Sequence, residues 1–285
     1  MSDASAAVDR FLQAAELNRT DPLRQGSLLV FPNYGQLVMT GDFHGHARNF
    51  SKLLKYLALD RTPIRHVMLH EIVHAAQDGP DGLDHSHEVL LDAARLKIDH
   101  PDQVHFLQSN HELAQFTGHD ITKGGRSSLR AFEEGLTAAY GEGPAQEVLH
   151  SIHQFILSLP LAGRTPNRVF LSHSLPDARK MDQFDPDVVH RVPTDADLVD
   201  GGSADLLVWG RRHTPEQLDA LGKHYDVDNF LVGHQRIDTG HKLTHDRVLI
   251  LASEHNHGEY LPFDLKKPYT MDQLVGLTRP YAAIA

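Results

Sequence analysis

The chain has 285 residues, 40% of them hydrophobic, and a formal net charge of −11 at pH 7. It contains no cysteine, which excludes disulfides, thiolate zinc sites and a cysteine nucleophile. The negative charge disfavours nucleic-acid partners, and the sequence has neither a membrane-length apolar run nor a signal peptide, so we expect a cytoplasmic protein with no membrane partner.

The N-terminal part of the chain alternates between helical and β-like patterns. A helical spacing of apolar residues comes first, and the later strands and helices follow one another in the order typical of α/β proteins. The expected strands are 27–31, 36–40, 65–69 and 103–107, and helices are expected near 50–57 and 88–97.

The middle of the chain predicts helices and the remainder predicts strands. We expect a single domain with a helical insertion at about 120–160, and a second half that is antiparallel in part. The β-like runs of this half are 168–171, 206–209, 230–232, 242–244, 248–252 and 260–263.

Five short polar motifs fall at the ends of expected strands. Carboxyl ends of strands are where open α/β sheets place their ligands, and the 22 histidines are the first metal ligands to consider in a chain without cysteine. The motifs are GDFHG at 41–45, HEIVH at 70–74, NHE at 110–112, SHS at 172–174 and GHQ at 233–235.

In order and placement these motifs resemble those of the calcineurin-like metallophosphoesterases, in particular the phosphoprotein phosphatase branch. The family pattern runs GDxHG, GDxxDRG, GNHE, a histidine, and GH. The stretch 252–260 resembles the family's closing SAPNYCGEF, and the resemblance covers about 37–264. It implies an α/β metallo-dependent phosphatase fold, in which two mixed β-sheets pack as a sandwich with flanking helices.

The resemblance also implies a function and a set of site residues. The activity would be hydrolysis of phosphomonoesters by a metal-bound hydroxide, on phosphoserine or phosphothreonine of proteins or on a small phosphoester, with two divalent ions as cofactors. Manganese is the first choice, with iron and zinc as alternatives. The implied metal ligands are Asp42 and His44 for one ion, Glu71 as the bridge, and Asn110, His173 and His234 for the other.

Three further residues have implied roles outside the metal shell. His111 is the expected general acid, and His74 stands where the family has the Asp that orients this histidine. We expect Arg212, of the pair Arg211–Arg212, to bind phosphate oxygens, since the stretch 205–212 resembles the family segment that precedes such an arginine.

The second motif departs from the family pattern. His70 replaces Gly, Glu71 replaces the bridging Asp, and Ala75 replaces an Arg that contacts phosphate. The longer Glu71 side chain moves its oxygens outward, and His74 can contact His111 but supplies no fixed negative charge. We therefore expect altered metal spacing or weaker turnover.

Two alternative functions remain open from the sequence. Residues 70–74 also match HExxH, the zinc-protease motif, in which His70 and His74 would bind zinc and Glu71 would activate water. That motif requires a helix, whereas 65–69 is an expected strand that continues directly into it. The second alternative is a noncatalytic metal-binding relative of the phosphatases.

Overall fold

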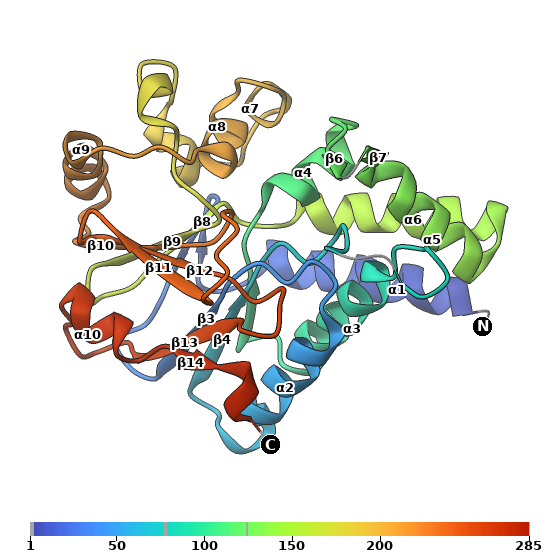
Figure 1. Ribbon diagram of the computed structural model, residues 1–285, viewed down its shortest axis with the longest axis horizontal. Helices are drawn as coiled ribbons and strands as arrows, with labels where there is room; N and C mark the ends of the chain where they lie inside the picture. The colour runs from blue at the N-terminus through green and yellow to red at the C-terminus, as the bar shows by residue number, and fades with distance from the viewer. Residues whose placement is uncertain (1–2, 77–78, 124, 285) are drawn as a thin grey trace.

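Two β-sheets packed face to face form the centre of the computed structural model, which describes residues 3–76, 79–123 and 125–284 (Figure 1). Helices cover the outer face of each sheet, so the layers run helix, sheet, sheet, helix. The expected α/β sandwich with two mixed sheets and flanking helices is confirmed.

The first sheet has five strands, and three of them are parallel neighbours. Strands β3, β4 and β5 run parallel, whereas β13 pairs antiparallel with β3. In sheet order the strands are β14 (Arg279–Pro280), β13 (Glu259–Asp264), β3 (Gln36–Thr40), β4 (Arg65–Leu69) and β5 (Val104–Phe106).

The second sheet has seven strands with a parallel centre. Strands β9, β10 and β12 run parallel, and β8 and β11 flank them in antiparallel pairing, as expected for this half of the chain. In sheet order the strands are β1 (Arg24–Gln25), β2 (Leu28–Val30), β8 (Ala162–Arg164), β9 (Val169–Ser172), β10 (Asn229–Val232), β12 (Val248–Leu251) and β11 (His241–Thr244); a separate hairpin joins β6 (Thr122–Lys123) to β7 (Arg126–Ser127).

Strand side chains alternate between two cores because successive residues point to opposite faces of a sheet. In β3, Leu37 and Met39 face the second sheet, while Val38 faces the outer helices. In β12, Leu249 and Leu251 face the first sheet in the same way. These side chains are fully buried, and the shared core fixes how the two sheets pack.

The outer helices divide between the two sheets. Helices α1, α2, α3, α5 and α6 pack on the first sheet, and α6 packs directly against α1 and α5 (Figure 1). The helices are α1 (Asp3–Arg19), α2 (Ala47–Leu57), α3 (Ser86–Asp99), α4 (Asn110–Thr117), α5 (Ser128–Tyr140), α6 (Glu142–Leu157), α7 (Asp195–Leu198), α8 (Ser203–Trp209), α9 (Pro215–Tyr225) and α10 (Met271–Val275), with 3₁₀ turns η1 (Leu59–Arg61), η2 (Ala178–Lys180), η3 (Pro186–His190) and η4 (Tyr281–Ala283).

One expected strand is wrong. The run 206–209 forms the end of α8, whose Leu206 and Leu207 pack on the outer face of the second sheet. A continuous apolar run of four residues has no period that separates a strand from a buried helix, which explains the error. Among the described residues no helix is long and apolar enough to cross a membrane.

Candidate metal centre

The polar motifs meet where the two sheets touch at the carboxyl ends of their parallel strands. Asp42 follows β3, Glu71 follows β4, and Asn110 begins the helix after β5. His173 and His234 follow β9 and β10 of the other sheet. A parallel bridge between Asp42 and Ala252, the residue after β12, joins the sheets at this edge.

Backbone hydrogen bonds hold the first two loops together. The N–H groups of Phe43 and His44 both donate to the carbonyl oxygen of Glu71, over 2.9 and 2.8 Å. On the other side, Glu112 Oε1 accepts from the N–H groups of Ile72 (2.6 Å) and Val73 (3.2 Å). The loop after β4 is therefore fixed between the β3 loop and α4.

Four of the predicted site residues have left-handed backbone conformations. The φ angles of His44, Glu71, His74 and His234 are 44°, 47°, 60° and 68°. Such conformations cost about 1–3 kcal/mol each in residues other than glycine and concentrate at functional sites. Residues 70–74 are not helical, so they cannot present His70 and His74 on one helical face as the HExxH protease motif requires.

Three donor atoms implied for one ion lie in a tight group. Asn110 Oδ1 is 2.7 Å from His173 Nε2 and 2.8 Å from His234 Nδ1, and the two nitrogens are 3.1 Å apart. Glu71 Oε2 is 2.9 Å from the same His173 nitrogen. Separations of about 3 Å match the edges of a coordination shell whose bonds are about 2.1 Å long. The donors fit a divalent ion.

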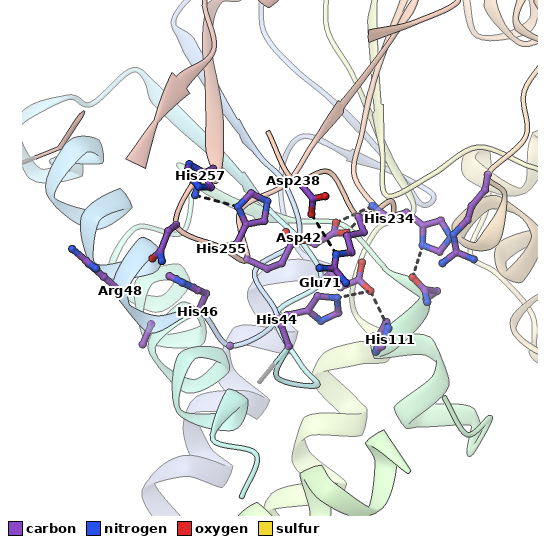
Figure 2. Close-up of a pocket in the computed structure, with 18 residues that line it drawn as sticks. Asp42, His44, His46, Arg48, Glu71, His111, His234, Asp238, His255 and His257 are labelled. Atoms are coloured by element: carbon purple, nitrogen blue, oxygen red, sulfur yellow. Dashed lines mark hydrogen bonds and ion pairs between the residues drawn. The ribbon is translucent and has the colours of Figure 1, made fainter. Parts of the chain in front are cut away.

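Of the two donors implied for the other ion, His44 lies near the second carboxylate oxygen of Glu71. His44 Nε2 is 3.6 Å from Glu71 Oε1 (Figure 2). On its other side, His44 Nδ1 is 3.1 Å from the carbonyl oxygen of Val73. That carbonyl accepts the Nδ1 proton, which leaves the Nε2 lone pair for a metal. Asp42 accepts from the His234 N–H over 2.8 Å.

The charges of the centre also favour a bound cation. Burial raises the pKa of Asp42 well above its usual value, and the nearby carboxylates of Glu71 and Glu254 raise it further. Burial lowers the pKa of His173 and of His234 well below the usual range, so both rings are neutral near pH 7. Crowded carboxylates beside neutral imidazoles are the donor set that a divalent cation stabilises.

His111 faces the donor cluster from α4. Its Nε2 is 3.5 Å from Glu71 Oε1, and its Nδ1 is 2.8 Å from Nδ1 of His74. His74 is in turn anchored by Gln115, whose Oε1 is 2.7 Å from His74 Nε2. The chain therefore orients His111 through a buried histidine and an amide.

No protein-family model matches the chain, and no curated protein matches its sequence. Among solved structures, a protein serine/threonine phosphatase from Saccharomyces cerevisiae superposes with a TM-score of 0.65 at 18% identity, over 91% of this chain and 82% of its own. A cold-active protein-tyrosine phosphatase of a psychrophilic Shewanella species gives 0.62 at 17% identity, over 94% and 82%. This chain has the fold of these phosphatases.

The centre of this phosphatase fold opens into a cavity of about 1140 Å³. Asp42, His44, His111 and His234 gather around Glu71 in the close-up, and the opposite end is formed by residues that include His46, Arg48, His255 and His257 (Figure 2).

The two neighbouring arginines differ in their position relative to this cavity. Arg211 lines it, and its charge contributes to the lowered pKa of His173, after burial. Arg212 points elsewhere: its side chain is 69% exposed, and its Nε lies 3.2 Å from Asp177 Oδ2. The structure brings Arg211, rather than the expected Arg212, to this cavity.

Sequence reasoning missed two residues of the phosphatase-fold centre. Glu254 lines the cavity and acts on the pKa of Asp42, yet it follows β12 inside a stretch matched only as a closing motif. Gln115 lies one turn after His111 on α4, a spacing that puts both on one helix face and could have identified it.

Proposed function

We propose that this protein hydrolyses phosphate monoesters with two divalent metal ions bound at the centre, manganese being the first ion to test. The observation that carries the proposal is that the predicted donors, from five segments and both sheets, fall in overlapping groups that share Glu71 or His173. Similarity in fold to protein phosphatases supports it. Bound ions would lower the pKa of a shared water and stabilise the charge that develops on the phosphoryl group.

Glu71 is the proposed bridge because its two oxygens face different donors. Oε1 lies near His44 Nε2, and Oε2 lies near His173 Nε2. Each oxygen can therefore serve a different ion, despite the side chain being longer than the family's Asp. The proposed ligands are Asp42 and His44 for one ion, Glu71 for both, and Asn110, His173 and His234 for the other.

His111 is the proposed general acid, and Arg211 the proposed phosphate-binding group. His111 Nε2 faces the donor cluster while its Nδ1 contacts His74, so the ring is oriented toward a bound ester. The planar guanidinium of Arg211 suits phosphate oxygens. The cavity has room for a phosphorylated side chain with its flanking peptide, as well as for a small phosphoester.

Metal content and turnover of p-nitrophenyl phosphate, measured together, test the proposal. Wild type is expected to bind two Mn²⁺ ions and to turn over the ester, and so is the control Glu88→Gln, whose side chain on α3 is 68% exposed. Glu71→Gln is expected to lose both ions because an amide carries no charge and bridges poorly. His111→Ala should keep both ions and lose about 10²–10⁴ in turnover.

Each alternative gives a different result in these measurements. Two tightly held ions without turnover of p-nitrophenyl phosphate or phosphopeptides would indicate a noncatalytic relative. Two ions retained in Glu71→Gln would remove Glu71 from the ligand set. A wild-type chain that binds no divalent ion would refute the proposed function.

A further inference from the structure

His70 is buried beside the proposed centre, at a position where the calcineurin-like metallophosphoesterases, which the motifs resemble, have glycine. Its side chain is wholly inaccessible to solvent. Its Nε2 lies 2.9 Å from the carbonyl oxygen of Thr40, and its Nδ1 lies 3.0 Å from Nδ1 of His173. Both ring nitrogens of His70 are thus within hydrogen-bond distance of a fixed partner.

The carbonyl of Thr40 determines which nitrogen of His70 carries the proton. A carbonyl oxygen can only accept, so the ring must donate from Nε2. A neutral imidazole has one proton, and a charged ring is disfavoured at a position with no access to water. Nδ1 of His70 therefore keeps its lone pair and faces His173 as an acceptor.

This lone pair in turn decides the tautomer of His173. The facing Nδ1 of His173 must carry the proton, because two lone pairs 3.0 Å apart would repel each other. Nε2 of His173 then keeps its lone pair, 2.7 Å from the Asn110 amide and 3.1 Å from His234 Nδ1. The amide of Asn110 can turn so that its NH₂ group donates to this lone pair, whereas the Thr40 carbonyl holds His70 Nδ1 as an acceptor. The ring nitrogen directed at the other donors is the one left free to bind a metal.

We propose that His70 is a positioning residue that fixes the tautomer of His173 and so selects Nε2 as its metal-binding atom. The role in metal binding rests on the proposed function, whereas the tautomer does not. His74 orients His111 in a similar way: its Nε2 contacts Gln115 Oε1, and its Nδ1 contacts Nδ1 of His111. Two histidines of the divergent second motif thus each orient a histidine of another segment.

Direct metal binding by His70 is the competing explanation. Asp42 Oδ1 lies 3.7 Å from Nδ1 of both His70 and His173, so an ion could bind among these three atoms. The 3.7 Å separations from Asp42 Oδ1, however, exceed the donor-to-donor distances of about 3 Å in the proposed cluster. Asn110, Glu71 and His234 all converge on Nε2 of His173 instead.

Two substitutions at His70 distinguish the effect of losing a hydrogen-bond acceptor from the effect of changing the side-chain volume. His70→Asn keeps an acceptor oxygen near the former Nδ1 position, whereas His70→Leu fills similar space without one. His153→Leu is the matched control, because His153 is a partly buried histidine on α6, outside the proposed centre. Circular dichroism of all three variants checks that each one folds.

Long-range ¹H–¹⁵N correlation spectra of the imidazoles, recorded on the metal-free full chain, report the tautomers directly. We expect His173 to be protonated at Nδ1 in wild type, His70→Asn and His153→Leu, and to shift toward protonation at Nε2 in His70→Leu. Mn²⁺ affinity from calorimetry should fall about 10–100-fold in His70→Leu, as for outer-shell partners of metal-bound histidines, and return to within about threefold in His70→Asn.

Three results would overturn the proposal. The first is protonation of His173 at Nε2 in the wild-type chain, and the second is an equal loss of Mn²⁺ affinity in His70→Asn and His70→Leu. The third is a His70 Nδ1 resonance that shifts on addition of diamagnetic Zn²⁺ as a metal-bound nitrogen does. Absence of any Mn²⁺ binding by wild type would refute the proposed function, and the spectra would still decide the tautomer.

Discussion

Replacing Asp21 with asparagine should destabilise the protein far more than an ordinary charge removal. Asp21 Oδ2 lies 2.9 Å from Lys97 Nζ and 2.9 Å from His105 Nδ1, and all three side chains are buried. The substitution leaves the ammonium of Lys97 buried without a counter-charge. Breaking a buried ion pair in this way costs about 3–5 kcal/mol of unfolding free energy.

The pH dependence of this ion pair follows from the pKa of Asp21. Burial raises that pKa, but the hydrogen bond from His105 and the charges of His105 and Lys97 outweigh it and hold the pKa well below its usual 3.8. A lowered carboxyl pKa contributes stability that is present above pH 3.8 and is lost as the pH falls through the folded-state value. Asp21→Asn should remove this part of the acid sensitivity.

Urea unfolding followed by circular dichroism measures the effect. The control is Asp92→Asn on α3, whose side chain is 58% exposed, and it should change the unfolding free energy by less than about 0.5 kcal/mol. Adding Lys97→Met to Asp21→Asn should recover much of the loss, because it removes the unpaired charge. The reasoning is refuted if Asp21→Asn costs no more than the control, or if the double variant is no more stable than Asp21→Asn.

Two further changes test the core and the edge of the centre. Burial lowers the pKa of His66 from 6.5 to about 4, so unfolding free energy should fall by about 1.4 kcal/mol per pH unit as the pH drops through that window. His66→Leu should remove this slope in pH-dependent urea unfolding, and exposed His150→Leu should not; equal slopes in the two variants would contradict the assignment. In Gly233→Ala the new methyl carbon would lie 2.1 Å from Asp42 Oδ1, so we expect a loss of about 1–3 kcal/mol in urea unfolding and weaker Mn²⁺ binding by calorimetry. Gly143→Ala, with nothing within 4 Å, is the control, and a Gly233→Ala protein equal to it in both measurements would show that the site relaxes freely.

The sequence was sufficient to predict most strands of the two sheets and the loops that carry the donors, although β8, between β2 and β9, was not predicted. Strands such as 36–40 and 65–69 were predicted within a residue, because buried β-branched and aliphatic runs bounded by turns leave little ambiguity. Motifs at their carboxyl ends then meet by topology, since parallel strands end at the same edge. Asp42, Asn110 and His234 were brought together in this way.

Contacts between distant segments could not be predicted from the sequence. Whether Arg211 or Arg212 faces the cavity depends on the backbone direction after α8, a segment that was itself expected to be a strand. The partners of His70 are a main-chain carbonyl at Thr40 and a ring 103 residues away, and no local pattern identifies either one. Such contacts depend on how whole layers pack.

The bridge between Asp42 and Ala252 limits how far the two sheets can move past each other. The main chains of the two segments are in close contact here. A Cβ on Gly41 would lie 2.4 Å from the backbone nitrogen of Ala252. The N–H of Ser253 donates to the carbonyl oxygen of Asp42 over 3.0 Å. The spacing between the donor loops is therefore set by main-chain contacts and not by any one metal-binding side chain. Side chains of these loops, His70 and Glu71 among them, can therefore change without changing the spacing between the loops.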